Sequence, residues 1–339
     1  MIPELIINWY LQNKRDLPWR KNKEPYSVWL SEIMLQQTKV TAVIPYYERF
    51  LAEFPTIGEL AAASEEKLFK LWEGLGYYSR ARNLQKAAVV IMQAHGGIFP
   101  GQYEQILNLP GIGPYTAGAI ASICFDLPIP AVDGNVLRVM ARIGEITGDV
   151  SLPAVKKEIS DTLAQIYPKS NCGDFTQGLM ELGATVCVPG GNPKCDECPV
   201  KNICIAFRNG TMNAIPFKKP KKTRKREEIT VLVLICDDKY AIRKREEKGL
   251  LSGLWEFPNY FGRLTSGQAM SLAADWGVMP ESIANVAEKT HIFTHIEWDM
   301  RFYLIPCNEQ PPSFLWAAEE ELRKIYTIPV AFQFPDFIF

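Results

Sequence analysis

Four of the eight cysteines in this 339-residue sequence lie in one short stretch. Cys187, Cys195, Cys198 and Cys204 are separated by seven, two and five residues, and the other four cysteines are scattered. Clustered thiols favour a metal site over disulfides. Four thiolates suit zinc or an iron–sulfur cluster, but a zinc ribbon usually carries two CxxC pairs instead of one. We expect a structural 4Fe-4S cluster, with zinc as the alternative.

The sequence LPGIGPYTAG at residues 109–118 places Gly111 and Gly113 between the end of one expected helix and the start of the next. Glycine permits a left-handed turn, and the free amides at a helix N-terminus bind anions. This hairpin could therefore hold a DNA phosphate. A plain glycine-rich helix connection is the alternative.

These motifs together resemble those of a known enzyme family. The LPGxGxxTA string resembles the helix-hairpin-helix of DNA repair glycosylases, and with Asp133 and the cysteine loop the chain resembles the endonuclease III superfamily. The strings WLSEIMLQQT (29–38) and WEGLGYYSR (72–80) resemble the MutY family of adenine DNA glycosylases. The resemblance covers essentially the full chain. It implies a repair enzyme that binds double-stranded DNA and removes adenine opposite 8-oxoguanine or G.

Glu32 is the candidate general acid. Cleavage of an N-glycosidic bond requires protonation of the leaving base and stabilisation of a cationic sugar, so two carboxyl groups in different environments are expected. On a helix, the neighbours of Glu32 one turn away form a largely apolar face: Val28, Trp29, Leu35 and Gln36. Desolvation there raises the pKa of the carboxyl. The resemblance implies that Glu32 protonates adenine N7; an exposed helix glutamate is the alternative.

Asp133 precedes an expected helix and is the second candidate carboxyl. As a helix N-cap it would accept backbone N–H bonds, which we expect to hold its pKa down. By resemblance, Asp133 stabilises the oxocarbenium-like sugar and Asn135 assists the water or the sugar. A purely structural cap explains Asp133 equally well.

Tyr115 occupies the hairpin-helix position at which lyases of the superfamily carry a Schiff-base lysine. Because a tyrosine supplies no amine, we expect a monofunctional glycosylase without strong lyase activity. Tyr115 is expected near the reaction centre, with a core tyrosine as the alternative.

Other residues are assigned to base recognition by resemblance. A base inside a duplex must be flipped out before this chemistry. Trp19, Arg20 and Leu35 are expected to line the adenine pocket, although a core position explains Trp19 nearly as well. Gln37 and Tyr77 are expected to insert near the orphaned 8-oxoguanine.

The C-terminal part contains GLLSGLWEFP at residues 249–258, which resembles the Nudix-like recognition domain of the same family. Residues 259–276 lack the Glu-rich RExxEE box of a Nudix hydrolase, so we expect this domain to recognise DNA without hydrolysing nucleotides. Phe293, Thr294 and His295 match the family's Phe-Ser-His sensor of 8-oxoguanine, with Thr294 in place of serine. A pair of strand-end histidines is the alternative.

The elements that must position these residues fall into two classes. From residue 3 to about 185 the apolar spacing is helical, with breaks at Pro and Gly. Residues 229–235 and 296–304 instead have strand patterns. We predict an all-α helix-hairpin-helix domain (1–204) that ends in the cysteine loop, a basic linker (205–228), and an α+β Nudix-like domain (229–339).

The net charge of -1 alone argues against a basic nucleic-acid binder, but the charges are unevenly distributed. Residues 218–226, here called the basic connector, carry +7, whereas residues 227–339 carry -7. A connector that crosses a duplex would neutralise phosphates and make binding salt-dependent. A disordered, solubilising linker is the alternative.

The composition, with 47% hydrophobic and 22% charged residues, is that of a soluble globular protein. The N-terminal residues lack the features of a signal peptide, and no apolar run approaches the length of a membrane span. We expect an intracellular monomer, located in the cytoplasm and, in a bacterium, on the nucleoid. The remaining alternatives are another glycosylase or lyase of the superfamily and a non-catalytic DNA-binding iron–sulfur protein.

Overall fold

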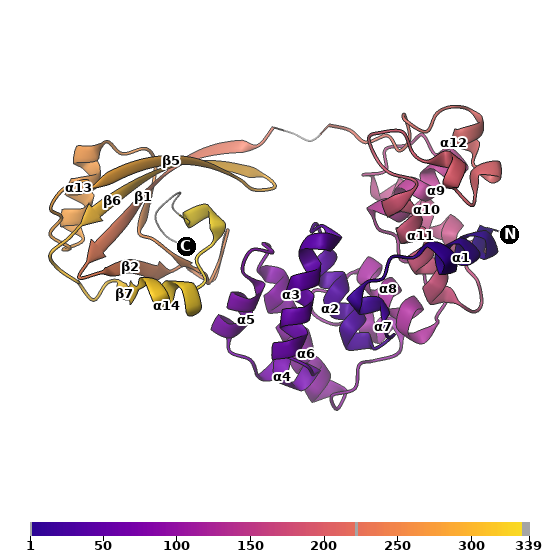
Figure 1. Cartoon of the computed structure of the whole chain (residues 1–339), viewed down its shortest axis with the longest axis horizontal. Helices are drawn as coiled ribbons and strands as arrows, with labels where there is room; N and C mark the ends of the chain where they lie inside the picture. The colour runs from indigo at the N-terminus through magenta and orange to yellow at the C-terminus, as the bar shows by residue number, and fades with distance from the viewer. Residues whose placement is uncertain (1, 221–222, 334–339) are drawn as a thin grey trace. The chain divides into compact units, whose positions relative to one another are not determined.

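The computed structural model describes residues 2–220 and 223–333 and divides into two compact units (Figure 1). The first unit comprises Met1–Ala62 and Arg82–Pro220, and the second comprises Ala63–Ala81 and Lys221–Phe339. The segment Ala63–Ala81 therefore groups with the C-terminal part of the chain. Residues 221 and 222 of the basic connector lie outside the described residues.

The first unit is helical, as predicted. Its helices are α1 (Ile2–Asn13), α2 (Pro25–Leu35), α3 (Val40–Glu53), α4 (Ile57–Ala62), α6 (Ser79–Ala94, which begins in the segment that groups with the second unit), α7 (Tyr103–Leu107), α8 (Pro114–Phe125), α9 (Gly134–Gly144), α10 (Pro153–Ile166), α11 (Cys172–Thr185) and α12 (Ile205–Arg208), with short 3-10 turns η1 (Pro18–Arg20), η2 (Cys195–Glu197) and η3 (Lys201–Ile203). The prolines at 25, 114 and 153 stand in the first turn of their helices, where no N–H is needed.

Pro45 differs from the expectation that prolines mark helix breaks. It lies inside α3, which continues to Glu53. The amphipathic packing of this helix, with Val43, Tyr47 and Phe50 buried, outweighs the single backbone hydrogen bond that proline cannot make.

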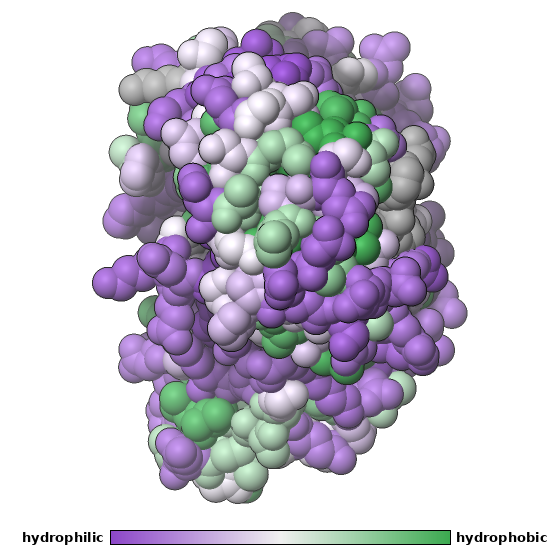
Figure 2. Space-filling view, turned by 90° about the vertical axis from the view of Figure 1, so that its left-hand side faces the viewer, coloured by the Kyte–Doolittle hydropathy of each residue, from purple (hydrophilic) through white to green (hydrophobic). Residues whose placement is uncertain are grey.

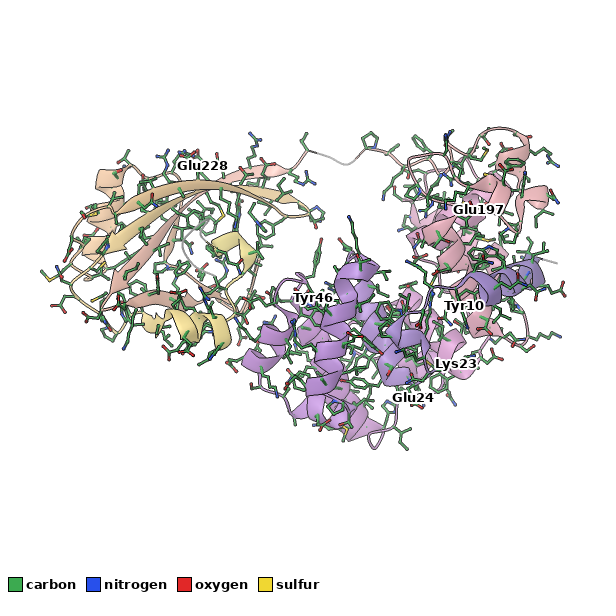
Figure 3. The ribbon with its side chains drawn as sticks, in the orientation of Figure 1. Tyr10, Lys23, Glu24, Tyr46, Glu197 and Glu228 are labelled. Atoms are coloured by element: carbon green, nitrogen blue, oxygen red, sulfur yellow. The ribbon has the colours of Figure 1, made fainter. Side chains whose placement is uncertain are left out.

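A close approach of α1 to α11 shapes the core of the first unit. Ile6 and Tyr10 of α1 are buried, and Tyr10 is labelled in Figure 3. They pack over Gly178 of α11, where an added Cβ would lie 2.7 Å from Ile6 Cγ2 and 3.2 Å from Tyr10 Cβ. Only glycine permits this spacing, which fixes the position of α11 and of the side chains on its neighbouring turns.

The second unit combines one short helix of the N-terminal half with a mixed sheet. Its elements are α5 (Glu65–Trp72), β1 (Lys225–Cys236), β2 (Lys239–Lys244), β3 (Trp255–Glu256), β4 (Asn259–Phe261), α13 (Ser266–Asp275), β5 (Asn285–Ile292), β6 (Ile296–Pro306), β7 (Leu315–Ala318), α14 (Glu319–Lys324) and η4 (Val330–Phe332). The predicted α+β class is confirmed, and β1 begins four residues before the expected start of the domain.

The sheet has the strand order β3-β2-β1-β6-β5, with β4 paired to β1 and β7 paired to β2. β1 and β6 are parallel, with Lys225 opposite Ile296 and Ile235 opposite Pro306. β1 is buried on both faces: Val231 and Val233 face a core that includes Leu322 of α14, whereas Leu232 and Leu234 face a core that includes Ala269 of α13. Burial on both faces explains the uninterrupted apolar run in the sequence of β1.

The side of the molecule on which Figure 1 draws the sheet is mainly hydrophilic in Figure 2, with apolar residues in small patches. Within the described residues, no helix has both the length and the apolar character needed to cross a membrane.

Candidate active site

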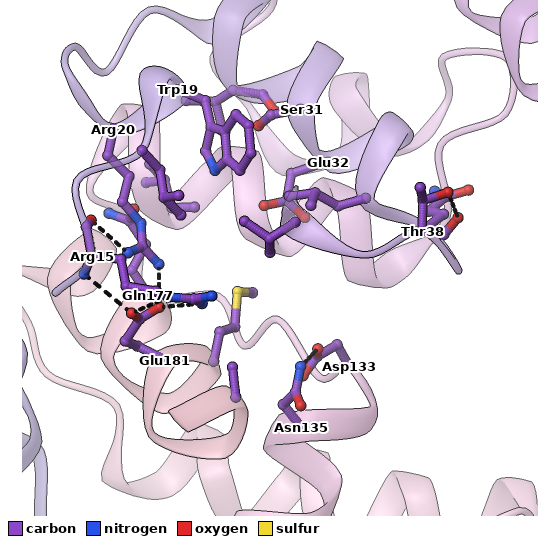
Figure 4. Close-up of a pocket in the computed structure, with 18 of the residues that line it drawn as sticks. Arg15, Trp19, Arg20, Ser31, Glu32, Thr38, Asp133, Asn135, Gln177 and Glu181 are labelled. Atoms are coloured by element: carbon purple, nitrogen blue, oxygen red, sulfur yellow. Dashed lines mark hydrogen bonds and ion pairs between the residues drawn. The ribbon is translucent and has the colours of Figure 1, made fainter. Parts of the chain in front are cut away.

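Eight residues predicted to act in catalysis or base binding line one cavity of about 330 Å³ in the first unit (Figure 4). They are Trp19, Arg20, Glu32, Leu35, Gln37, Tyr115, Asp133 and Asn135. Its volume lies within the range of small-ligand sites, about 300–1,000 Å³. Most of the cavity wall comes from η1, α2, α8, α11 and the start of α9. Residues far apart in the sequence therefore converge on one space.

Glu32 lies on α2 and is only 7% exposed. The hydroxyl of Tyr115 on α8 donates a 2.5 Å hydrogen bond to Glu32 Oε2. Burial raises the pKa of Glu32 to about 7, and the charge of Asp133 adds to this increase. The hydrogen bond from Tyr115 and the charge of Arg20 act in the opposite direction. The expected desolvation of Glu32 is therefore present, and near neutral pH the carboxyl is poised between its acid and ionised forms.

Asp133 is the N-cap of α9, as predicted. Its Oδ1 accepts from Val136 N at 2.7 Å, and its Oδ2 accepts from Asn135 Nδ2 at 2.7 Å. The expectation of a lowered pKa is wrong. Burial raises the pKa of Asp133, and the hydrogen bonds from Val136 and Asn135 and the charge of Arg138 offset only part of the effect. The sequence shows the local donors of a cap but not the burial that opposes them.

A second layer of hydrogen bonds holds Asn135. Arg138 Nη2 donates to Asn135 Oδ1 at 2.9 Å and to the carbonyl of Gly183 at 2.8 Å, while its Nε donates to the carbonyl of Cys187 at 2.7 Å. One guanidinium thereby connects the Asp133–Asn135 pair, the end of α11 and the first residue of the cysteine loop.

Trp19 is both buried and part of the cavity wall. The side chain of Trp19 lines the cavity, is 7% exposed, and packs edge-on against Tyr47 of α3 with ring centroids 5.4 Å apart.

Gln37, another predicted residue of the cavity wall, follows α2 in a left-handed conformation with φ of 59°.

Sequence reasoning left several polar residues of the cavity wall unassigned, among them Arg15, Gln177 and Glu181. Gln177 and Glu181 are four residues apart on α11 and share a helix face. Their spacing of one helical turn was the available signal. The pairing of Glu181 with Arg15 joins residues 166 positions apart, which the sequence does not show.

Six other predicted residues are not among the described residues that line the cavity: Tyr77, Gly111, Gly113, Phe293, Thr294 and His295. Gly111 has the left-handed φ of 75° expected for a turn, whereas Gly113 is extended and is the N-cap of α8. The left-handed expectation thus holds for one glycine of the hairpin.

Tyr77 and Thr294 both belong to the second unit, and their hydroxyl oxygens are 2.6 Å apart. Thr294 and His295 form the tip of the β5–β6 hairpin, closed by the hydrogen bond from Phe293 N to Ile296 O. Phe293 packs between His291 and Trp298, with centroid distances of 4.5 and 4.8 Å.

The four clustered cysteines line a second cavity together with Arg142, whose Nη1 lies 3.2 Å from Cys187 Sγ. Glu197, labelled in Figure 3, lies between two of these cysteines in the sequence. Burial raises the pKa of the Cys198 thiol to about 11. In the described part of the chain, no group of three or more His, Cys, Asp or Glu residues is arranged to hold one metal ion.

Two known families match separate stretches of the chain. Residues 30–168 match the HhH-GPD superfamily of base excision DNA repair proteins, and residues 230–333 match the NUDIX domain. The adenine DNA glycosylase of Buchnera aphidicola (subsp. Acyrthosiphon pisum) is 39% identical over 258 residues, covering 76% of this chain and 73% of the relative. The chain belongs to the adenine DNA glycosylase family.

Other members of the adenine DNA glycosylase family match nearly the whole chain. The Homo sapiens protein is 34% identical and the Mus musculus protein 36% identical, over 94% and 93% of this chain and 70% and 73% of the relatives. A thermostable thymine-DNA glycosylase has a TM-score of 0.56 and 28% identity, over 61% of this chain and 95% of that one. An endonuclease III in a trapped covalent DNA complex, at TM-score 0.52 and 23% identity over 62% and 96% of the two chains, shows the same fold. The predicted family, fold class and glycosylase class are confirmed.

Proposed function

We propose that this chain binds double-stranded DNA and hydrolytically removes adenine that lies opposite 8-oxoguanine or G. The observation that carries the proposal is the cavity in which Glu32, with a pKa of about 7, faces a second carboxyl group on Asp133. Two carboxyls in unequal environments are what cleavage of an N-glycosidic bond requires. The family points to adenine as the base.

Glu32 is the proposed general acid, and adenine N7 is the proposed acceptor of its proton. Because Tyr115 donates to Oε2, the proton of neutral Glu32 is available on Oε1. Burial, together with the charges of Glu32 and Asp133, raises the pKa of Tyr115 well above 10, so the hydroxyl remains a donor throughout. General acid catalysis of this kind accelerates a reaction by about 10²–10⁴-fold.

Asp133 is the proposed stabiliser of the positive charge that develops on the sugar. Its position at the N-cap fixes both carboxylate oxygens, through Val136 and Asn135. A cationic sugar nearby favours the ionised form of Asp133 and offsets the effect of burial. Asn135, held in turn by Arg138, orients Asp133 and assists the water or the sugar.

The reaction ends at the abasic site without strand cleavage. No lysine is among the described residues that line the cavity, and Tyr115, which takes the place of the lyase lysine, is bound to Glu32. A Schiff base with the sugar needs an amine. We therefore expect a monofunctional glycosylase.

The flipped adenine would occupy the cavity, with Trp19, Arg20 and Leu35 around it. Gln37 and Tyr77 would lie near the orphaned 8-oxoguanine, which Phe293, Thr294 and His295 would read. The hydrogen bond between Tyr77 and Thr294 supports a shared role of these two residues. Gly111 and Gly113, at the turn before α8, would hold a phosphate.

Cys187, Cys195, Cys198 and Cys204 are the proposed ligands of a 4Fe-4S cluster. The four thiols line one cavity, and their spacing, with one CxxC pair and single flanking cysteines, favours an iron–sulfur cluster over a zinc ribbon. When bound, the cluster crosslinks the loop that follows α11. Arg142 and Arg138 place positive charge and N–H donors against this loop.

The test uses duplexes with A opposite 8-oxoguanine, A opposite G, and T opposite G, each analysed with and without alkali. We expect free adenine from the first two duplexes, and strand breaks only after alkali. Release of thymine from the T:G duplex would favour the thymine glycosylase class of the structural neighbour. Strand cleavage as fast as adenine release, without alkali, would contradict a monofunctional reaction.

A further inference from the structure

Glu181 is a fully buried carboxylate on α11 that binds two arginines in the wall of the candidate active site. Its Oε1 accepts from Arg15 Nε at 2.6 Å, and its Oε2 accepts from Arg15 Nη2 and Arg20 Nη2, each at 2.8 Å. Burial alone would raise the pKa of Glu181, but the hydrogen bonds and charges of both arginines lower it to about 2. Glu181 is therefore ionised throughout the neutral pH range.

The guanidinium of Arg20 has further contacts besides Glu181. Arg20 Nη1 donates to the carbonyl of Arg15 at 3.2 Å, and Arg20 Cζ lies 5.4 Å from the ring centroid of Tyr10. The side chain of Arg20 is 12% exposed and that of Arg15 is 39% exposed. Figure 4 shows Arg15, Arg20 and Glu181 on one side of the cavity, joined by dashed lines that mark their hydrogen bonds and ion pairs. With Glu181 ionised, this group carries a net charge of +1; without it, the charge would be +2.

This charge matters because Glu32 opens onto the same cavity. The titratable and charged groups that face Glu32 are Tyr115 and Cys124 on α8, Asp133 at the start of α9, and Arg20 in η1. Among these, Arg20 supplies the positive charge, which favours the ionised form of Glu32. An acid that must donate its proton near neutral pH is impaired by added positive charge.

We propose that Glu181 is a positioning residue of the glycosylase reaction: it holds Arg15 and Arg20 in the pocket wall and neutralises one of their charges, so that Glu32 keeps its proton at neutral pH. This inference rests on the proposed role of Glu32 as the acid. No sequence motif indicated Glu181, since its partners lie more than 160 positions away in the chain.

The test is the pH dependence of single-turnover adenine release, measured for the full chain on a duplex with A opposite 8-oxoguanine. The rate of the wild type falls on the alkaline side as Glu32 ionises. In Glu181→Gln the uncompensated arginines move this alkaline limb to lower pH by roughly half a unit or more. In Arg15→Met, with Glu181 intact, the limb moves to higher pH. Glu181→Asp retains the charge and leaves the limb in place, even where the rate falls.

Lys14→Met is the matched control for Arg15→Met. It removes the same charge from the adjacent position, and Lys14 does not line the cavity. Its alkaline limb should coincide with that of the wild type.

Four results would overturn the inference. If the alkaline limbs of Glu181→Gln and Arg15→Met shift in the same direction, the charge of Glu181 does not balance that of the arginines. If both limbs are unchanged and only the rates are lower, Glu181 has a structural role alone. If Glu181→Gln fails to fold, an unshifted limb in Arg15→Met is sufficient to reject the proposal. A wild-type rate without an alkaline limb would instead reject the acid role of Glu32, and the inference with it.

Discussion

At the residue scale, the proposed chemistry depends on carboxyl groups whose environments differ. The apolar neighbours of Glu32 on its own helix made its raised pKa predictable from the sequence. The cap formed by Asp133 was predictable too, but the burial that raises its pKa comes from elements remote in the sequence. Glu181 was not predictable, because its ionised state depends on two arginines brought to it by folding. The environment that a helix gives its own side chains can be predicted from the sequence, whereas an environment made by tertiary contacts cannot.

The first residue-scale prediction concerns the pH dependence of adenine release. Glu32 must be protonated to donate, and burial raises its pKa to about 7. The single-turnover rate should therefore be near its maximum below pH 7 and should fall by about tenfold for each further pH unit above it. A rate that stays constant from pH 6 to pH 9 would show that no group of this kind donates the proton.

The second residue-scale prediction concerns the free energy of unfolding. The pKa of Glu32 is about 7 in the folded chain against an ordinary value of 4.5, so its contribution to stability falls as pH rises from 4.5 to 7 and is lowest above 7. Glu32→Gln should therefore stabilise the protein by about 1–3 kcal/mol at pH 8, and much less at pH 4. Urea unfolding at both pH values tests this, and a destabilised variant at pH 8 would contradict it.

At the element scale, α11 places Gln177 and Glu181 in the cavity wall and leads into the cysteine loop. Helical periodicity predicted the all-α domain, because the apolar residues of an amphipathic helix recur with the helical period on the face that is buried. The position of a helix against its neighbours depends instead on contacts such as that of Gly178 with α1, which periodicity does not encode. β1 was recognised from its apolar run, but its charged first residues, from Lys225 to Glu228, were assigned to the linker.

The prediction at this scale is that Gly178→Ala destabilises the chain by about 1–3 kcal/mol, because the new Cβ would overlap Ile6 of α1. Urea unfolding gives the free energy directly. Gly191→Ala is the control: no atom lies within 4 Å of the position of its Cβ, so its effect should be small. Equal stability of Gly178→Ala and the wild type would show that α1 shifts without cost.

At the scale of the whole molecule, the charge distribution is more informative than the net charge. The described ends of the basic connector are tied to their own units. On the first-unit side, Val150 N donates to the carbonyl of Phe217, the residue immediately before the connector, at 3.1 Å. On the second-unit side, Arg224 Nε donates to Phe293 O at 3.1 Å and Lys225 N to His295 O at 3.2 Å. The connector thus begins and ends in ordered structure, and its C-terminal end supports the hairpin proposed to read 8-oxoguanine.

We predict that the connector contributes to the salt dependence of DNA binding. Replacing the exposed Lys218 and Lys219 by serine should reduce the slope of log K against log salt by about 0.9 for each lysine that contacts a phosphate. Lys156→Ser combined with Lys169→Ser removes two exposed lysines elsewhere and serves as the control. An unchanged slope in the connector variant would show that these two lysines do not contact phosphates and that the connector only joins the two units.

The most direct test of the central claim is single-turnover adenine release by the wild type and by Glu32→Gln, on a duplex with A opposite 8-oxoguanine. Glutamine keeps the shape of the side chain and can still accept a hydrogen bond from Tyr115, but it has no acidic proton to donate. Loss of the general acid should lower the rate by about 10²–10⁴-fold while duplex binding is retained. Adenine release by Glu32→Gln at the wild-type rate would contradict the account.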